Sequence, residues 1–290
     1  ISMVQFVYDE AFSRNLGWVT VAEQAALRGK RVAIAGMGGV GGVHLLTLAR
    51  LGIGAFHIAD MDVFELVNFN RQVGATVSNL QRPKAAALAE MARDINPELD
   101  IRLFERGVDD ANLGDFLDGV DLYVDGLDFF AFDARRATFR ACAARGIPAV
   151  TAAPLGMGTA VLSFLPGQMS FEYYFCLDGC DEEEMAIRFL LGLSPAMLQR
   201  GYLADPSRVN LAEQRGPSTI AACQLCAGVT AVEALKILLG RGDVLCAPRG
   251  FQFDAYRNRY VRTWRPGGNR NPLQRLALFI ARRQLRAMRR

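Results

Sequence analysis

The 290-residue sequence contains only two histidines and six cysteines. His44 falls within an expected helix and His57 within an expected strand, where we predict structural roles for both. Six cysteines are too few for a disulfide scaffold in a chain of this length, so we expect reduced thiols.

Long uncharged apolar runs are also absent. No apolar segment reaches the roughly 18 residues typical of a transmembrane helix without a charge, so we expect no membrane span. The first residues lack the basic-then-apolar pattern of a secretory signal. The expected location is therefore the cytoplasm.

Acidic residues are missing from the C-terminal part of the chain. No aspartate or glutamate follows Asp254, whereas eleven arginines do. The first 254 positions contain the other 22 basic residues and all 30 acidic residues, so they carry a net charge of −8. The sequence therefore predicts an acidic body with a basic tail.

The tail from Leu273 to Arg290 has the spacing of an amphipathic helix. We favour a helix docked on the body, with its arginines facing the acidic surface. An anionic partner, either nucleic acid or the acidic face of a small protein, stays an alternative, and adsorption to a membrane surface comes last. The expected arginine face comprises Arg275, Arg282, Arg286 and Arg289. The apolar face opposite it comprises Leu273, Leu276, Ile280 and Met288.

Strand and helix signals alternate through the first half, which predicts an α/β fold with a doubly wound, Rossmann-like, mainly parallel sheet. Antiparallel strands are expected in the second half, at 159–165, 251–256 and 260–264, before a linker at 266–272. The other expected strands are 31–35, a strand ending on Asp60, 101–104, 120–124 and 147–151. The expected helices are 83–95, 132–145, 183–191 and 219–239.

A glycine-rich turn follows the first strand. Its glycines are Gly36, Gly38, Gly39, Gly41 and Gly42. Such a turn lets backbone N–H groups approach phosphate oxygens at a helix N-terminus. Asp60 follows the second strand, about where an acidic side chain meets a nucleotide ribose. Taken alone, this pattern also fits a nicotinamide or flavin site.

Polar and cationic residues after the second strand favour a triphosphate over a dinucleotide. They are Asn68, Asn70, Arg71, Gln72 and Lys84. The plain alternative is a solvated loop with an Asx turn. Beside a phosphate-binding turn, the same groups suit a clamp on triphosphate oxygens.

The motifs together resemble those of the ThiF/MoeB/HesA family, the ATP-dependent adenylyltransferases related to ubiquitin-activating enzymes. The resemblance covers roughly Tyr8 to Tyr260 and makes 1–265 an adenylation domain, with a nucleotide-binding half to about 155 and a substrate half beyond it, followed by the tail at 266–290. It rests on G-x-G-G-x-G-G, Asp60 and Asp62, N-x-N-R-Q, Lys84, Asn96-Pro97 and Asp128, in this order.

The resemblance implies a role for each matching residue. The glycine turn would hold ATP, Asp60 its ribose, and Asn68, Arg71, Gln72 and Lys84 the phosphates. Asp128 would position Mg²⁺, and Arg14 would reach across a homodimer to the partner's ATP. Arg135 or Arg136 matches a further family arginine, although either fits an ordinary surface position.

Adenylation joins a carboxylate to the α-phosphate and expels pyrophosphate. A carboxylate is already ionised near neutral pH, so no general base is required, in keeping with the two histidines. Catalysis would come from positioning and charge compensation by Arg71, Lys84, Arg14 and the Asp128-bound metal.

The sequence also departs from the family pattern. Cys176 and Cys180 have C-x₃-C spacing where many members have the first of two zinc-binding CxxC pairs, and no cysteine follows Cys246. Cys223 and Cys226 fall within a long expected helix as small core residues. We therefore expect no structural zinc. Whether Cys176 or Cys180 accepts an acyl group stays open, and Phe129 stands where relatives usually have asparagine.

We therefore expect a homodimeric, Mg²⁺- and ATP-dependent adenylyltransferase. Its substrate would be the C-terminus of a ubiquitin-like sulfur-carrier protein or of a peptide. The first alternative is a dehydratase that adenylates a carboxylate-bearing tRNA nucleoside, for which the arginine tail is suited. A nicotinamide-dependent oxidoreductase and a nucleotide-binding partner without turnover are less favoured.

Overall fold

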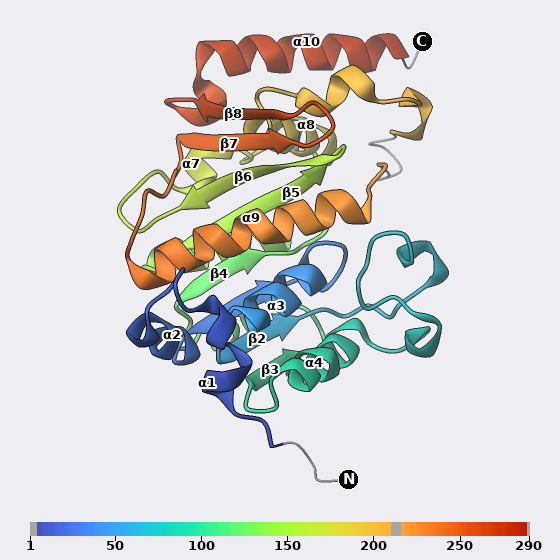
Figure 1. Ribbon diagram of the computed structural model, residues 1–290. Coiled ribbons are helices and arrows are strands. Elements are labelled where there is room, and N and C mark those ends of the chain that lie inside the picture. Colours follow the sequence, from blue (N-terminus) through green and yellow to red (C-terminus); the bar gives the residue numbers. More distant parts are fainter. Residues whose placement is uncertain (1–4, 210–215, 289–290) are drawn as a thin grey trace. The chain divides into compact units, whose positions relative to one another are not determined.

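The computed structural model describes residues 5–209 and 216–288, and side chains only as far as Leu285 within the last helix. Two compact units make up the chain (Figure 1). The first unit comprises the chain up to Leu127 together with Ala227–Asp243. The second comprises Asp128–Cys226 and the chain from Val244 onward.

The first unit is built on four parallel strands in the order β3-β2-β1-β4. They are β1 (Arg31–Ala35), β2 (Ala55–Ala59), β3 (Asp100–Phe104) and β4 (Leu122–Asp125). Apart from its first residue, β1 is fully buried, as expected for a strand covered on both faces. The carboxyl ends of β1, β2 and β4 therefore lie at the same edge of the sheet.

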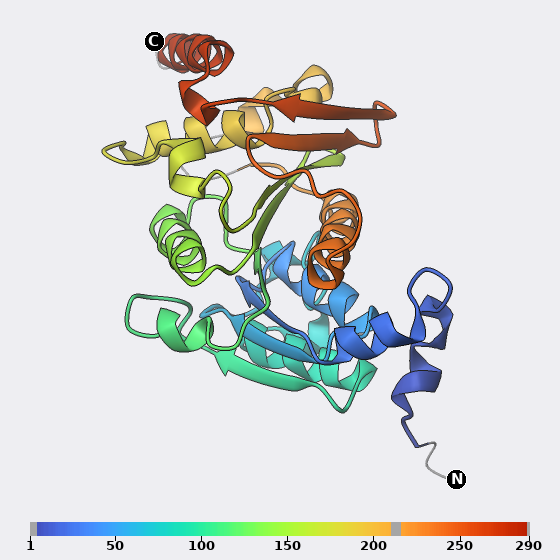
Figure 2. The ribbon, with the colours of Figure 1, turned by 90° about the vertical axis from the view of Figure 1, so that its left-hand side faces the viewer.

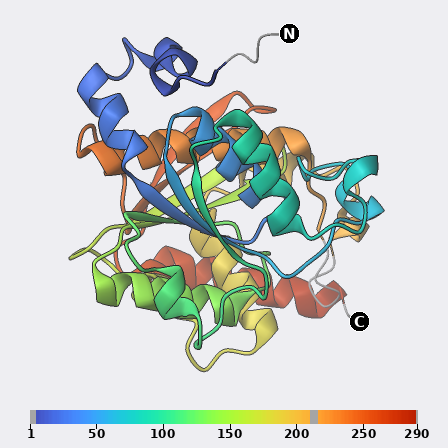
Figure 3. The ribbon, with the colours of Figure 1, turned by 90° about the horizontal axis from the view of Figure 1, so that it is seen from below.

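Helices connect these strands, as is usual for parallel sheets, whose crossover connections are generally right-handed. The helices before Leu127 are α1 (Tyr8–Ala11), α2 (Val21–Arg28), α3 (Gly41–Arg50), α4 (Lys84–Ile95) and α5 (Leu113–Phe116). Helices α3 and α4 pack against each other (Figure 3), and their contact includes Gly42 against Leu88. Short 3-10 helices occupy Ser13–Asn15, Leu66–Asn68 and Val77–Asn79.

The second unit contains four antiparallel strands in the order β5-β6-β7-β8. These are β5 (Ala149–Leu155), β6 (Gly158–Phe164), β7 (Arg249–Asp254) and β8 (Arg259–Trp264). Figure 2 shows α6 (Phe132–Arg145), α7 (Phe171–Phe175) and α8 (Glu182–Leu193) on one face of these strands. An aromatic cluster that includes Phe139, Phe164 and Phe171 fills the space between them. Further 3-10 helices lie at Leu198–Tyr202, Pro206–Arg208 and Gly268–Arg270.

Helix α9 (Ile220–Leu239) is long and apolar enough to cross a membrane by length and composition alone, a test that buried core helices also pass. It carries Glu233 and Lys236, whose side chains form an ion pair of 2.6 Å. Cys223 and Cys226 are fully buried on it, as the sequence predicts for small core residues. These features are those of a core helix.

The C-terminal helix α10 (Pro272–Met288) docks on the second unit, and Arg282 of its predicted arginine face pairs with Glu184 of α8. Its buried Leu278 packs with Ile187 and Leu191 of α8, and Ala281 and Leu285 join this cluster. The side chains Leu273, Leu276 and Ile280 of the predicted apolar face are exposed. Met288 and the arginines Arg286 and Arg289 of the predicted faces lie outside the residues whose side chains are described.

The fold class predicted from the sequence is confirmed, with parallel strands in the first unit, antiparallel strands in the second and a basic helix at the C-terminus. Pro83 was expected at the first helical position of α4 but is its N-cap residue. Lys84 takes the first position instead, which places its side chain at the edge where β1 and β2 end.

Candidate nucleotide-binding site

The glycine turn after β1 is close-packed on one side. Gly36 has φ +85°, and a Cβ atom there would overlap the carbonyl group of Gly126. A Cβ atom at Gly41 would overlap the carbonyl oxygen of Gly36. Gly126, which follows β4, lies against both, since its own Cβ would come within 2.9 Å of Gly41 Cα. These three positions therefore admit no side chain.

The other side of the turn is open. A Cβ atom at Gly38 would meet only the Gln72 side chain, at 3.7 Å from Nε2. Gly39 lies in the same turn and is half-buried. Because α3 begins at Gly41, the backbone N–H groups of this turn are in the arrangement that binds phosphate groups.

Asp60 joins the glycine turn to the loop after β2. Its Oδ2 accepts a hydrogen bond from the backbone N–H of Met37 at 2.6 Å, and its Oδ1 accepts one from Asp62 N–H at 2.8 Å. Burial raises the pKa of the Asp60 carboxyl above its usual range, while these two N–H groups act in the opposite direction. The side chain thus lies at the edge of the site rather than free in solvent.

Lys84 and Asp62 extend this chain of contacts. The Lys84 Nζ lies 3.0 Å from Asp62 Oδ2, and its backbone N–H donates to the Asp62 carbonyl at 2.9 Å. The Lys84 side chain is only 8% exposed, whereas that of Asp62 is 65% exposed. A buried ammonium with one exposed carboxylate partner has unused donors, which suits a further anion.

The loop at 68–72 places two buried amides beside the turn. Asn68 Oδ1 accepts from Glu65 N–H, so this side chain shapes the loop. The Gln72 amide is also buried, yet its Oε1 has no hydrogen-bond partner among the described residues. A buried amide with an unmatched polar atom next to Gly38 calls for a ligand or water partner. The residues present therefore fit a nucleotide.

Arg71 and Asn70 lie on the outer part of the same loop. The Arg71 Nη1 donates to the Val67 carbonyl at 2.9 Å and to Asn70 Oδ1 at 3.1 Å. The guanidinium is thus oriented by its own loop, with its remaining N–H groups available for an oxyanion. The structure therefore brings six of the predicted side chains together in the first unit: Asp60, Asp62, Asn68, Asn70, Arg71 and Gln72, with Lys84 beside them.

Arg14 is exposed on the 3-10 helix at Ser13–Asn15. Its side chain makes no hydrogen bond or ion pair with any described residue. Its neighbour Asn15 fixes this helix by donating to Gln24 Oε1 at 3.2 Å. The structure therefore leaves Arg14 as a solvent-facing cation on an ordered support.

Asp128 follows β4 by three residues and begins the second unit. It is exposed, and its Oδ1 accepts a hydrogen bond from Phe130 N–H at 3.0 Å. The buried Arg135 donates to the backbone carbonyls of Asp128 and Phe129, at 2.9 and 3.1 Å, and lies over the Phe189 ring. Arg135 thus holds the loop that presents Asp128.

Arg136 points elsewhere in the second unit. Its guanidinium forms ion pairs with Glu172 at 2.9 Å and Asp178 at 3.3 Å. These carboxylates raise the pKa of Arg136. Both candidates for the further family arginine are therefore engaged by protein groups.

The histidines and cysteines add no general base or metal cluster. Burial lowers the pKa of His44 to about 4, and His57 Nδ1 lies 2.8 Å from the Phe116 carbonyl oxygen. All six cysteines are free thiols. Within residues 5–209 and 216–288, no three histidine, cysteine, aspartate or glutamate side chains gather as a metal site.

The structure adds Gly126 to the predicted set. The close approach between this residue and the turn after β1 is a tertiary contact, so no spacing rule along the chain reveals it. The one local signal is the Asp125-Gly126 dipeptide directly after a buried strand. Together the site offers backbone N–H groups, a buried ammonium and a guanidinium around an open turn, which is the chemistry of phosphate binding.

Comparison with known proteins gives the same picture. The family model described as the ThiF family matches residues 12–276. The SAMP-activating enzyme E1 of Haloferax volcanii is 34% identical over 127 residues, covering 44% of this chain and 46% of its own. The tRNA threonylcarbamoyladenosine dehydratase of Bacillus subtilis is 30% identical over 141 residues, covering 48% and 55%.

A third relative is the probable adenylyltransferase/sulfurtransferase MoeZ of Mycobacterium tuberculosis, 38% identical over 108 residues that cover 37% of this chain and 28% of MoeZ. The matched part of this chain thus spans about half, or less, of the length of these curated relatives. Among solved structures, Escherichia coli MccB with ATP has a TM-score of 0.67 at 18% identity, covering 90% of this chain and 73% of MccB. PaaA also has a TM-score of 0.67 at 18% identity, covering 91% of this chain and 75% of PaaA.

The two structural likenesses establish the fold alone, because their identities are low. The family match is of a different kind, since it extends over nearly all of the chain and includes the glycine turn, the loop at 68–72 and Lys84. The chain belongs to the ThiF family.

Proposed function

We propose that this protein is an ATP-dependent adenylyltransferase that activates a carboxylate as its acyl-adenylate. One observation carries the proposal. A continuous chain of contacts runs from Met37 N–H through Asp60 and Asp62 to the buried ammonium of Lys84. A redox dinucleotide has no need of a buried cation at this point, whereas the β- and γ-phosphates of ATP do.

In the proposed reaction a carboxylate oxygen of the acceptor attacks the α-phosphorus. The new bond is the acyl oxygen–phosphorus bond, and the bond that breaks joins the α-phosphorus to the oxygen leaving with pyrophosphate. Lys84 and Arg71 would offset the negative charge on these oxygens. Because the attacking carboxylate is already ionised, His44 and His57 can stay neutral and buried.

Magnesium is part of the proposal, with Asp128 as its protein ligand. Mg²⁺ is commonly held by one or two carboxylates together with substrate phosphates and water, so one exposed carboxylate is a suitable donor set. The free Asp128 Oδ2 on a loop held by Arg135 meets this requirement. When bound, the ion would neutralise phosphate charge.

The proposed acceptor is the C-terminal carboxylate of a small ubiquitin-like or sulfur-carrier protein, or of a peptide. The names of the similar proteins support this class, since they include a SAMP-activating enzyme and a sulfur carrier protein ThiS adenylyltransferase of Escherichia coli. A tRNA nucleoside carboxylate is the second candidate. It is favoured by the acid-free arginine tail and by the tRNA dehydratases among the relatives.

A homodimer is also proposed, with Arg14 acting on the partner's nucleotide. The support comes from the surface around Arg14. Trp18 is 86% exposed and Val21 73% exposed, which is unusual for large apolar side chains so close together in the chain. Burying them against a second copy would bring Arg14 to that interface.

The proposal is tested by ATP–pyrophosphate exchange with candidate acceptors. Exchange should appear only when an acceptor carboxylate is present. Asp128→Ala should abolish it while the protein stays folded, because the exposed Asp128 side chain loses only one hydrogen bond, from Phe130 N–H. Asp133→Ala, which removes an exposed carboxylate further along the same segment, is the matched control and should keep full exchange. Persistent exchange in Asp128→Ala would refute the role given to this residue.

A further inference from the structure

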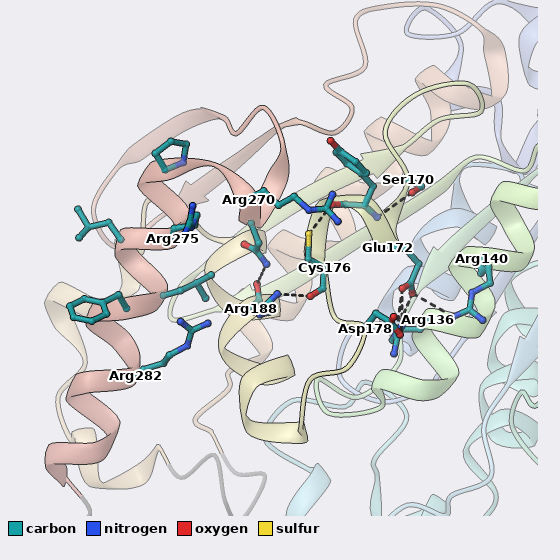
Figure 4. Close-up of a pocket in the computed structure, with 16 residues that line it drawn as sticks. Arg136, Arg140, Ser170, Glu172, Cys176, Asp178, Arg188, Arg270, Arg275 and Arg282 are labelled. Atoms are coloured by element: carbon teal, nitrogen blue, oxygen red, sulfur yellow. Dashed lines mark hydrogen bonds and ion pairs between the residues drawn. The ribbon is translucent and has the colours of Figure 1, made fainter.

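A large pocket lies wholly within the second unit, and the adenylation site does not use it. It is formed by α6, α7, α8, the 3-10 helix at Gly268–Arg270 and α10, with a volume of about 1440 Å³ (Figure 4). Cavities for single small ligands usually measure about 300–1,000 Å³. The size of this pocket therefore suits a segment of a polymer.

The pocket is strongly basic. Its lining contains the two carboxylates of Glu172 and Asp178 and six guanidinium groups: Arg136, Arg140, Arg188, Arg270, Arg275 and Arg282. The surplus of positive charge is therefore four among the lining side chains. Because arginine stays protonated at any physiological pH, this surplus is permanent.

Some of these arginines shape the pocket. Arg136 is held by Glu172 and Asp178. Arg188 donates to Glu184 at 2.5 Å and to the Cys176 carbonyl at 2.6 Å. Glu184 also accepts from Arg282 of α10, and this contact lowers the pKa of the Glu184 carboxyl. These contacts fix α7, α8 and α10 around the cavity.

Other arginines are free to bind. Arg270 and Arg275 form no ion pair with any described residue, and Arg270 stacks on the half-exposed ring of Tyr173 at 4.6 Å. Arg140 is 65% exposed and has only a long contact of 3.9 Å to Glu172. Figure 4 shows these side chains around the opening. They can take up a ligand anion without breaking a fold contact.

The wall on α10 is apolar. Leu276 and Phe279 line the pocket and remain 56% and 53% exposed, and Leu273 and Ile280 continue the exposed apolar row along the helix. None of the four is needed for docking α10, which is the task of Leu278. An exposed apolar row beside unpaired cations indicates a binding surface.

We propose that this pocket docks an acidic, partly apolar segment of the polypeptide acceptor. The mixture of groups favours a polypeptide over a nucleic acid. An aliphatic wall has no counterpart in a phosphate backbone. A peptide with acidic and leucine-like residues matches both the arginines and the apolar wall, as in helix-in-groove recognition.

The inference rests on the proposed function in one respect, that the acceptor is a polypeptide. Docking at this pocket would be separate from the chemistry, because it involves no group assigned to ATP. It would hold the acceptor by a surface other than its reacting carboxylate, so its loss would raise the acceptor KM with little change in kcat.

The test measures binding by fluorescence anisotropy to the full chain, without ATP. The probe is a fluorescein-labelled peptide with glutamates and leucines at helical spacing, compared with a single-stranded oligonucleotide of equal charge. We expect the peptide to bind more tightly. The double variant Arg270→Glu/Arg275→Glu should weaken peptide binding by roughly tenfold or more, whereas Arg259→Glu/Arg262→Glu on β8 should not.

Phe279→Ser tests the apolar wall, with Leu273→Ser as its matched control on the same helix. Only Phe279→Ser should weaken binding of the peptide, because Phe279 lines the pocket and Leu273 does not. Arg270→Gln/Arg275→Gln removes the two charges without reversing them, and should give a smaller loss in the same direction if the reversed variant unfolds. Melting temperatures check each protein.

Three results would overturn the inference: no peptide binding, equal weakening by the pocket and β8 variants, or tighter binding of the oligonucleotide that is lost in the pocket variants. The last would assign the pocket to nucleic acid. Acceptor-dependent pyrophosphate exchange is measured separately, so failure of docking and failure of adenylation give different patterns.

Discussion

His44 is a titratable side chain sealed inside the first unit, one turn after the glycine bend. Neither ring nitrogen has a hydrogen-bond partner among the described residues. Burial lowers its pKa from 6.5 to about 4, with the Asp125 carboxylate acting weakly in the opposite direction. The folded state therefore disfavours the imidazolium form, and helix α3 depends on this ring being neutral.

This burial predicts an acid-sensitive component of stability. Because the folded pKa lies below the unfolded one, the contribution is fully present above pH 6.5 and is lost as the pH falls toward 4. We expect the free energy of unfolding to drop by about 2 kcal/mol between pH 7.5 and 5 from this group. Urea unfolding of His44→Leu at both pH values should show a smaller drop in the free energy of unfolding than the wild type shows. A drop equal to that of the wild type would contradict the role given to His44.

The glycines of the turn divide into structural and binding positions. Gly36→Ala should lower the free energy of unfolding by about 3 kcal/mol or more, because φ is positive and the new methyl group meets Gly126. Gly38→Ala should change the free energy of unfolding by less than about 0.5 kcal/mol. It should nevertheless weaken ATP binding, because its methyl group would point into the open side of the turn. Denaturant titration and calorimetry with ATP distinguish the two. Equal destabilisation would show that the open side is packed.

Much of the site was predictable at this scale because its residues lie in two short stretches of chain. The turn at 36–42 and the loop at 60–72 each form locally, so their spacing along the sequence is informative. Gly126 escaped notice because its role exists only once β1 and β4 are paired. The part played by Arg135 was likewise hidden, since a buried arginine and a surface one look alike in a helical sequence.

At the scale of elements, helix α10 shows how a helical wheel can find a helix and its inward-facing arginine without identifying the apolar residues that dock it. The predicted apolar face held Leu273, Leu276 and Ile280, which are exposed, whereas the helix docks through Leu278, Ala281 and Leu285. Gln274 adds a buried hydrogen bond to the Leu191 carbonyl at 2.9 Å. Two apolar stripes are available on this helix, and only the partner surface on α8 decides between them.

Docking through Leu278 predicts a contrast between two aliphatic side chains on one helix. Leu278→Ala should lower the free energy of unfolding by about 2–4 kcal/mol, because it empties a buried position against Ile187 and Leu191. Ile280→Ala should stay within about 0.5 kcal/mol, as expected for an exposed residue. Guanidinium titrations monitored by circular dichroism provide the comparison. The reverse order would contradict docking through Leu278.

Four short helices, α1, α2, α5 and α7, were not predicted from the sequence, and two of them show different reasons. Helix α2 begins with a capping box of Thr20 and Glu23, a sequence signal that was available. Helix α7 consists of Phe-Glu-Tyr-Tyr-Phe, whose aromatic residues favour strands by propensity. It is helical because Phe171 and Phe175 pack on Phe189, a contact made only in the folded unit.

At the scale of the whole molecule, the predicted homodimer gives a complementation test. Arg14→Ala should abolish exchange if Arg14 acts on the partner's nucleotide, and Asp128→Ala should abolish it within its own subunit. Mixing the two inactive proteins creates heterodimers with one intact site, so up to about a quarter of wild-type activity should return for random exchange.

Subunit exchange is checked independently by labelling each variant with a different fluorophore. If heterodimers form and activity stays absent, Arg14 does not act in trans. A single Trp18→Glu substitution is the matched disruption of the exposed apolar surface, and it should yield monomers by sedimentation.

The arrangement around Arg135 has a further consequence. This buried guanidinium holds the main chain of the bend after β4 through two carbonyl groups, and the exposed Asp128 carboxylate adds one hydrogen bond, from Phe130 N–H. Most of the support of the bend therefore comes from Arg135 and not from the Asp128 side chain. Asparagine keeps an acceptor oxygen for Phe130 N–H, so Asp128→Asn is expected to change the charge at the proposed metal site without rebuilding the bend.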